Sequence, residues 1–370
     1  MNKQDNIKLI FSAGGTGGHI LPALAVADKI RELHPSSEIL FIGAKGRMEM
    51  EKVPQAGYNI IGLPVMGFQR KLSFKNLKFP FMLLYSMFKA SYVIRKFKPN
   101  AVVGFGGYAS GPTLRIAQNK KITTFIQEQN SFPGVTNKIL AQKAQKIFVA
   151  YENMNIFFAK EKLIYAGNPI RLSLLRKLKT KDKARKIFHL DSNKPTVFIM
   201  GGSQGALSIN KAIHNNLKKF NQHNIQIIWQ TGKHYIQQAT FDIKRLNIHN
   251  IKPYVFINNI DDAFAAADIV VSRAGALSIA ELSITGKACI FVPLPSAAED
   301  HQTKNALQLV NKNAAKLLPN NKVESNLFKT ITDLLDNKEE IITLQKNIQS
   351  FAKPHATETI AKEILKQIKQ

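Results

Sequence analysis

The chain has 370 residues, 45% of them hydrophobic and 21% charged, a composition typical of globular proteins and a length that suits two domains. Its single cysteine, Cys289, excludes an internal disulfide and a cysteine metal cluster, and its apolar neighbours favour a buried, inert thiol in a cytosolic protein. No signal peptide is recognisable and no apolar run approaches the roughly 20 residues of a spanning helix, so a soluble or peripheral protein is expected.

Charge is distributed unevenly along the chain. The net charge is +27, yet no acidic residue lies between Glu51 and Glu128. This window carries twelve basic residues, namely Lys52, Arg70, Lys71, Lys75, Lys78, Lys89, Arg95, Lys96, Lys98, Arg115, Lys120 and Lys121. Such a one-signed field attracts polyanions or an anionic membrane surface. A generally lysine-rich composition explains part of the total charge but not the window, and no nucleic-acid recognition motif accompanies it.

Short apolar strands alternate with helices through the first half of the chain. The predicted strands are residues 7–13, 38–43, 59–63, 101–104, 123–127 and 146–150, and the predicted helices are 21–33 and 77–97. In the second helix, large apolar side chains recur at helical spacing, at Phe81, Leu84, Tyr85, Phe88 and Tyr92. Repeated β-α units with continuous apolar strands predict a parallel sheet with helices on both faces.

The second half repeats this alternation after a predicted hinge at Asn168-Pro169, where the residue before proline resists the helical state. A charged helix is predicted over 171–188, followed by strands at 196–200, 225–230, 255–257, 269–272 and 288–292. Residues 327–370 are predicted to be helical with a break at Pro354. The amphipathic piece from about Glu358 is expected to pack across the first domain.

These elements predict an α/β fold with two doubly wound domains. The expected boundaries are 1–168 for the first domain, 169–345 for the second, and 346–370 for a C-terminal helix that returns to the first.

Each predicted domain contains a glycine-rich loop that follows a strand and opens a helix. The first loop is GGTGGH at 14–19 and the second is GGSQGA at 201–206, about half the chain further on. Backbone amides in such a turn, together with the helix N-terminus, favour an anion such as a phosphate. A dinucleotide-binding fold would place an acidic residue at the end of the next strand, but that strand ends in Gly43-Ala44-Lys45.

Several side chains near these loops are candidates for chemistry. His19 closes the first loop and has the pKa range of a general base, the alternative being a capping or core histidine. Ser203 and neighbouring amides form a candidate diphosphate cradle, or only a tight turn. Glu281, in the helix after Arg273, faces either solvent or a sugar diol. The polar segment 299–305 suits sugar hydroxyls, or is a helix start capped by Asp300. No metal-ligand spacing and no nucleophile elbow is visible.

In their order and spacing, six motifs resemble those of the MurG family, the N-acetylglucosaminyltransferases that convert lipid I to lipid II in bacterial peptidoglycan synthesis. The motifs are GGTGGH at 14–19, GYASGP at 107–112, EQN at 128–130, GNPIR at 167–171, GGSQGA at 201–206 and SRAGA at 272–276. The resemblance covers essentially the whole chain. It is the combined set that is specific, not any single glycine loop.

The resemblance implies two Rossmann-like domains that face a cleft, the GT-B arrangement, and an inverting transfer without metal or cofactor. The implied donor is UDP-N-acetylglucosamine (UDP-GlcNAc), held mainly by the second domain. Its uracil would be read by backbone groups near Ile257, its ribose diol by Glu281, and its diphosphate by Ser203 and neighbours. Further implied donor contacts are Ala276, Leu277, Ser278, Ile279, Ala280 and Gln302, the last of which belongs to a loop, 296–302, that varies in the family.

The resemblance also assigns roles in the first domain. Thr16, Gly17, Gly18 and Asn130 would approach the donor sugar or the acceptor, and Arg171 would lie at the seam between domains. His19 would take the proton from the C4 hydroxyl of the muramyl sugar as that oxygen attacks C1 of the donor.

The implied acceptor is lipid I, undecaprenyl-pyrophosphoryl-MurNAc-pentapeptide, which is anchored in the membrane. The basic window fits an anionic bilayer because lysines are interleaved there with Phe68, Phe74, Phe79, Phe81 and Phe88. The protein is therefore expected to lie peripherally on the cytoplasmic face of the bacterial inner membrane. A UDP-GlcNAc 2-epimerase of the same fold is the alternative, and it would need neither acceptor nor membrane patch.

Overall fold

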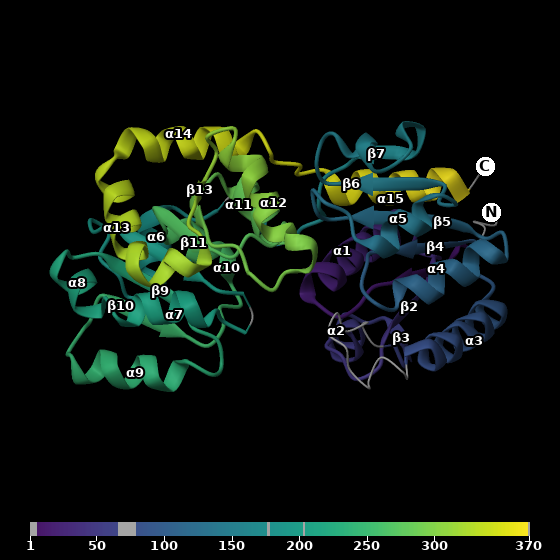
Figure 1. Ribbon diagram of the computed structural model, residues 1–370, viewed down its shortest axis with the longest axis horizontal. Helices are drawn as coiled ribbons and strands as arrows, with labels where there is room; N and C mark the ends of the chain where they lie inside the picture. Colours follow the sequence, from purple (N-terminus) through teal and green to yellow (C-terminus); the bar gives the residue numbers. More distant parts are fainter. Residues whose placement is uncertain (1–5, 66–78, 176–177, 203, 369–370) are drawn as a thin grey trace. The chain divides into compact units, whose positions relative to one another are not determined.

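The computed structural model describes residues 6–65, 79–175, 178–202 and 204–368 (Figure 1). The chain divides into two compact units. One unit comprises Met1–Arg171 and Lys353–Gln370, and the other comprises Leu172–Ala352. Each unit is built around its own parallel sheet and is described by itself below.

The first unit contains a seven-stranded sheet in which every pairing is parallel. In sheet order the strands are β3 (Asn59–Leu63), β2 (Glu38–Ala44), β1 (Lys8–Ser12), β4 (Ala101–Gly104), β5 (Thr123–Glu128), β6 (Lys146–Val149) and β7 (Leu163–Tyr165). The helices are α1 (Gly17–Leu33), α2 (Glu49–Gln55), α3 (Phe79–Phe97), α4 (Ser110–Asn119), α5 (Val135–Ala141) and α15 (Ala356–Ile368). The chain moves outward from β1 in both directions, so right-handed crossovers place α1 and α4 on opposite faces.

The second unit contains a six-stranded sheet, again parallel throughout. In sheet order the strands are β10 (Ile251–Tyr254), β9 (Gln226–Gln230), β8 (Thr196–Met200), β11 (Ile269–Ser272), β12 (Ala288–Phe291) and β13 (Lys316–Leu317). The helices are α6 (Lys181–Ile187), α7 (Leu207–His214), α8 (Leu217–Gln222), α9 (Ile236–Arg245), α10 (Ile260–Ala266), α11 (Ala276–Thr285), α12 (His301–Val310), α13 (Val323–Asp336) and α14 (Lys338–Gln349).

The predicted fold class is confirmed by these two sheets, and so is the return of the last helix. Helix α15 lies against α1 in the first unit (Figure 1), where Ile360, Ala361 and Ile364 are fully buried in the same core as Phe11 and Val26. The C-terminal segment therefore completes the hydrophobic core of the unit that begins the chain.

Three local predictions were wrong. The single helix over 171–188 is a 3-10 turn (Leu172–Leu175) followed by α6, which starts at Lys181 because Thr180 takes the extended backbone of an N-cap residue. The strand predicted at 255–257 ends at Tyr254 and contains Pro253, which is tolerated because β10 is an edge strand.

The long C-terminal helix is also interrupted earlier than Pro354. Asn337 separates α13 from α14, and its side-chain Oδ1 accepts a hydrogen bond from the Glu340 N–H at 3.0 Å. In the part of the chain described, no helix combines the length and the apolar content that crossing a membrane requires.

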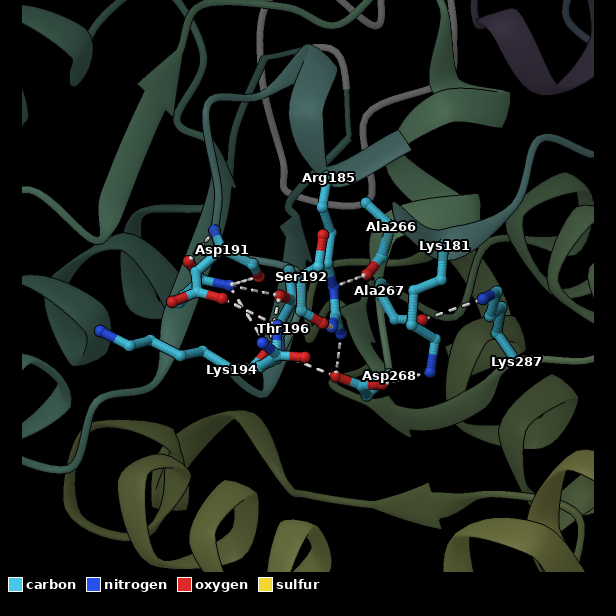
Figure 2. A network of polar contacts seen from close by, with 12 residues as sticks. Lys181, Arg185, Asp191, Ser192, Lys194, Thr196, Ala266, Ala267, Asp268 and Lys287 are labelled. Atoms are coloured by element: carbon cyan, nitrogen blue, oxygen red, sulfur yellow. Dashed lines mark hydrogen bonds and ion pairs between the residues drawn. The ribbon is translucent and has the colours of Figure 1, made fainter. Parts of the chain in front are cut away.

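An ionic cluster fastens α6 to the amino edge of the second unit's sheet (Figure 2). Asp268 accepts hydrogen bonds from Lys181 Nζ and Arg185 Nη2, both at 2.6 Å, and from the Thr196 N–H at 2.8 Å. Arg185 also donates to the Ala266 carbonyl at 3.1 Å. A cavity of about 570 Å³ lies beside this cluster, on the edge of the sheet opposite to the glycine loop.

Lys287 lies next to this cluster and donates from Nζ to the Ala267 carbonyl at 2.9 Å (Figure 2). Burial, with a smaller contribution from the positive charge of Lys181, lowers the pKa of Lys287 to about 8 from its ordinary value of 10.5. At a pH between these two pKa values, Lys287 is therefore more fully protonated in the unfolded chain than in the folded one.

We expect the free energy of unfolding to rise with pH across this interval, by up to about 3 kcal/mol from Lys287 alone. The measurement is urea unfolding of wild type and Lys287→Met at a series of pH values, followed through the fluorescence of Trp229, the single tryptophan, which lies in the same unit. The stability of wild type relative to the variant should increase with pH. A constant difference would mean that Lys287 titrates normally.

Candidate functional site

The turns at the carboxyl edge of the first sheet pack main chain against main chain. A Cβ added at Gly107, which follows β4, would collide with the carbonyl oxygen of Gly14, which follows β1. Gly107 also has a φ of +83°, which disfavours other residues. The turn after β5 joins the same assembly, because Gln129 Nε2 donates to the Phe105 carbonyl at 2.7 Å. Loop 14–19 and Asn130 are thereby brought to one edge of the sheet.

His19 lies in the first turn of α1, which Thr16 caps with an extended backbone. Its Nδ1 is 3.0 Å from the Gly14 carbonyl oxygen and 3.2 Å from Thr16 Oγ1. A carbonyl can only accept, so the contact with Gly14 fixes the proton of the neutral ring on Nδ1 and the lone pair on Nε2. The ring packs on Gly106, where a Cβ would lie 2.7 Å from His19 Cδ2. His19 is half-buried and oriented by its own loop.

A buried carboxylate holds the first glycine loop from behind. Glu49, in the first turn of α2, is fully buried and accepts from the Gly15 N–H at 3.1 Å and from the Ala44 N–H at 2.8 Å. Glycine is required at two positions that pack on the Glu49 side chain. A Cβ at Gly14 would collide with Glu49 Oε1, and a Cβ at Gly43 would lie 2.6 Å from Glu49 Cγ. The hydrogen-bond acceptor at the Gly15 amide is therefore a side chain of the protein, which the sequence did not indicate.

Glu128, the last residue of β5, likewise holds the turn that follows its strand. Its carboxylate accepts from the N–H of Asn130 at 3.0 Å, from Asn130 Nδ2 at 3.2 Å and from Asn137 Nδ2 at 2.7 Å. Burial raises the pKa of Glu128 above its ordinary value, an effect that outweighs the lowering by its hydrogen bonds to Asn130 and Asn137. Asn168, the first residue of the predicted hinge, is tied to the same turn because its Nδ2 donates to the Gln129 carbonyl at 3.0 Å.

The remaining predicted residues of the first unit lie at or near this edge. Thr16 is exposed, Gly17 and Gly18 are half-buried in the first turn of α1, and Arg171 is half-buried at the last residue before the second unit. In the first unit the structure brings Thr16, Gly17, Gly18 and His19 into one turn, with Asn130 held at the same edge by Glu128.

The second unit repeats the close approach of turns at its carboxyl edge. A Cβ at Gly205 would collide with the Thr231 carbonyl oxygen, and one at Gly232 would collide with the Gln204 carbonyl oxygen. The turn after β8 and the turn after β9 are thus in direct main-chain contact. Ser203, the predicted diphosphate contact, lies outside the described residues.

Gln230, at the end of β9, links two of the predicted donor subsites and was missed by the sequence analysis. Its Oε1 accepts from the Ile257 N–H at 3.0 Å and its Nε2 donates to the Gly202 carbonyl at 3.0 Å. Ile257, the predicted uracil contact, is itself buried. The one signal available in the sequence was a polar residue closing an apolar strand, which is common to many turns.

Helix α11 begins at Ala276 after Gly275, whose extended backbone serves as the N-cap. Ala276, Leu277, Ser278 and Ala280 are half-buried, and Ile279 is buried. Glu281 is only 5% exposed, so the solvated alternative for this glutamate is wrong. The side chain lies inside the protein, in the second turn of α11.

Arg273 fastens the start of α11 to its surroundings. Its guanidinium donates to the Val292 carbonyl at 3.1 Å, to Asn320 Oδ1 at 2.7 Å and to Ser208 Oγ at 3.1 Å. Desolvation lowers the pKa of Arg273 from its ordinary value. The residue therefore ties the turn after β11 to the turn after β12 and to α7.

Gln302 lies in the first turn of α12, where its Oε1 accepts from the Leu294 N–H at 2.9 Å. The preceding Glu299 and Asp300 both have left-handed backbones, with φ of 53° and 51°. Asp300 makes no side-chain cap bond and instead accepts from Thr303 Oγ1 at 2.7 Å. Among the residues that the structure describes, no group of three or more His, Cys, Asp or Glu side chains is arranged to hold a metal ion.

Two family models match this chain, one for each half. The glycosyltransferase family 28 N-terminal domain matches residues 9–149, and the glycosyltransferase family 28 C-terminal domain matches residues 196–362. Together they cover most of the chain.

Relatives that match over almost their whole length share one protein name. The chain is 49% identical to a UDP-N-acetylglucosamine--N-acetylmuramyl-(pentapeptide) pyrophosphoryl-undecaprenol N-acetylglucosamine transferase of Cytophaga hutchinsonii, over 98% of both chains. It is 47% identical to the protein of the same name from Bacteroides fragilis, over 100% of both.

Solved structures agree in fold. The crystal structure of Acinetobacter baumannii MurG matches with a TM-score of 0.78 and 30% identity, over 98% of this chain and 99% of that one. The UDP-GlcNAc 2-epimerase of Neisseria meningitidis bound to UDP-GlcNAc matches with a TM-score of 0.67 but only 16% identity, over 97% of this chain and 100% of that one. The second likeness shows the shared fold alone.

Proposed function

This chain belongs to glycosyltransferase family 28, and on that premise we propose that it transfers N-acetylglucosamine from UDP-GlcNAc to lipid I, giving lipid II in peptidoglycan synthesis. The observation that carries the proposal is the 49% identity to a transferase of that name over 98% of both chains. The 2-epimerases, at 11% to 16% identity, share only the fold.

The second unit is the donor-binding half of the enzyme in this proposal. By function we divide the chain into an acceptor domain (1–168), a donor domain (169–345) and a C-terminal helix (346–370). The uracil is read at Ile257, the ribose diol by Glu281, and the diphosphate by Ser203 and neighbouring amides. The buried carboxylate of Glu281 supports its role, because a desolvated acceptor discriminates strongly for hydroxyl donors. The α11 start (Ala276, Leu277, Ser278, Ile279 and Ala280) and Gln302 complete the donor contacts.

The first unit binds the acceptor and supplies the base. His19 removes the proton of the muramyl C4 hydroxyl while that oxygen attacks C1 of the donor, inverting its configuration. The hydrogen bond from Nδ1 to Gly14 supports this role, since it leaves the lone pair on Nε2. Thr16, Gly17, Gly18 and Asn130 position the sugars, and Arg171, the last residue of the first unit, contributes to substrate binding. Helix N-termini and loop amides stabilise the departing UDP, so neither metal nor cofactor is required.

The acceptor's lipid chain calls for a membrane-binding face, and helix α3 offers one. Phe81 and Phe88 are 75% and 74% exposed, and Leu84, Tyr85 and Tyr92 are exposed on the same helical face. Exposed Arg95 and Lys96 lie in the last turn of this helix. Aromatic side chains beside cations suit the headgroup region of an anionic bilayer. The protein would lie peripherally on the cytoplasmic face of the plasma membrane. Phe68 and Phe74 lie outside the described residues.

The deciding experiment is transfer of radiolabelled N-acetylglucosamine from UDP-GlcNAc to a lipid I analogue in the presence of EDTA. We expect labelled lipid II at a rate that EDTA does not change. Release of a free epimer from the donor, with no label in the lipid, would refute the transferase and favour an epimerase. A rate that collapses in EDTA would refute the metal-free mechanism.

Two substitutions separate the base from the donor site. His19→Ala should lower kcat by about 10² to 10⁴ because a general base is lost, with UDP affinity nearly unchanged. Glu281→Ala should instead raise the KM for UDP-GlcNAc by at least about tenfold through loss of a buried hydrogen-bond acceptor. Steady-state kinetics and calorimetry with UDP test both. Normal kcat with abolished UDP binding in His19→Ala would reassign that residue to the donor.

Membrane binding is tested by the double variant Phe81→Ser, Phe88→Ser in sedimentation with phosphatidylglycerol vesicles. We expect partitioning to fall at least about tenfold, because two large apolar side chains no longer enter the interface. The matched control is Phe241→Ser, which removes a 65% exposed phenylalanine from α9 in the other unit. Equal losses in both variants, or none in the double variant, would contradict a membrane role for α3.

A further inference from the structure

Gln230 occupies a central position at the carboxyl edge of the second sheet. It is the last residue of β9, which pairs with β8 on one side and β10 on the other. The segments that follow β8 and β10 carry the predicted diphosphate and uracil contacts. Because neighbouring strands lie about 4.8 Å apart, these two outer segments start nearly 10 Å from each other. A side chain on the middle strand is therefore well placed to join them.

The amide of Gln230 joins them with a fixed orientation. Ile257 offers an N–H and Gly202 a carbonyl, so Oε1 must face the former and Nε2 the latter, each at 3.0 Å. The side chain is 3% exposed, which shields both bonds from competing water. If the amide were reversed, its NH₂ group would face the Ile257 N–H and its oxygen would face the Gly202 carbonyl oxygen, and neither hydrogen bond could form. Only a neutral group with one donor end and one acceptor end fits this position.

We propose that Gln230 is a positioning residue that holds the uracil-reading segment and the diphosphate loop of the donor site in mutual register. The inference rests on the proposed function, since it takes UDP-GlcNAc as the ligand of both segments. Gln230 need not touch the donor. Its effect is to pre-align two subsites, so that a ligand spanning both gains affinity that neither half of the ligand gains alone.

The chain itself offers a matched control four residues earlier on the same strand. Gln226 is also 3% exposed and also bonds through both ends of its amide, to the Asp191 N–H at 2.7 Å and the Asp191 carbonyl at 2.8 Å. It lies at the amino edge of the sheet, away from the predicted donor contacts. Gln226→Met and Gln230→Met should therefore lower the melting temperature to a similar extent, while only the second should affect ligands.

The test is calorimetric binding of UDP, UMP and inorganic pyrophosphate to the full-length protein and both variants. In Gln230→Met we expect UDP affinity to fall about tenfold, while UMP and pyrophosphate, which each occupy less of the site, change by less than about threefold. Gln226→Met should bind all three like wild type. Kinetically, Gln230→Met should raise the KM for UDP-GlcNAc more than it lowers kcat.

Three results would overturn the inference while leaving the proposed function standing. They are UDP affinity in Gln230→Met within about twofold of wild type, an equal loss for all three ligands, and an equal loss in Gln226→Met. Failure of wild type to bind UDP at all would refute the proposed donor site, and this inference with it.

Gln230→Glu supplies a second readout that does not depend on the folding of the methionine variant. A neutral carboxyl group can accept from the Ile257 N–H and donate to the Gly202 carbonyl, whereas a carboxylate repels that carbonyl. The UDP affinity of this variant relative to wild type should therefore be highest near pH 5.5 and should not rise as the pH is raised. If the UDP affinity of Gln230→Glu relative to wild type is no higher near pH 5.5 than at higher pH, the two-bond bridge is not what aligns the site.

Discussion

In each unit, the candidate site residues depend on direct contact between main-chain segments at the carboxyl edge of the parallel sheet. In the first unit the turn after β4 approaches the turn after β1 so closely that no Cβ is tolerated at Gly107. In the second unit Gly205 and Gly232 allow the same approach between the turns after β8 and β9. Glycine is required at these positions by the absence of space, and Gly107, Gly205 and Gly232 also have positive φ. The candidate functional groups are attached to these turns, and the contacts fix where those groups lie.

The two units satisfy their turn amides with different chemistry. In the first unit two buried glutamate side chains, Glu49 and Glu128, accept hydrogen bonds from loop N–H groups. In the second unit the corresponding bridging group is Gln230, a neutral amide. The neutral amide suits the proposed diphosphate loop, because a carboxylate bonded at Gly202 would repel a diphosphate.

Charge and apolar surface are likewise separated according to their proposed tasks. The exposed aromatic face of α3 and the acid-free window lie in the first unit, which is proposed to meet the lipid acceptor. The second unit uses its charged residues differently: at the amino edge of its sheet, Asp268 joins Lys181 and Arg185 in a partly buried cluster that fastens α6. That cluster and its cavity stand at the opposite edge from the predicted donor contacts.

The sequence by itself determined the fold class, the alternation of elements and the location of the turns that carry the site. Continuous apolar strands and glycine-rich turns are local patterns, and they predicted β8 and β11 to the residue as well as the loops after β1 and β8. Local patterns failed where position in the sheet decides the outcome, as with Pro253, which is acceptable in β10 only because that strand is at an edge. The partners of Glu128 lie within nine residues of it, whereas Glu49, Arg273 and Gln230 acquire hydrogen-bond partners from segments distant in the sequence. The tertiary structure decided these roles, because a hydrogen bond between turns of different strands depends on strand order and burial, neither of which local sequence encodes.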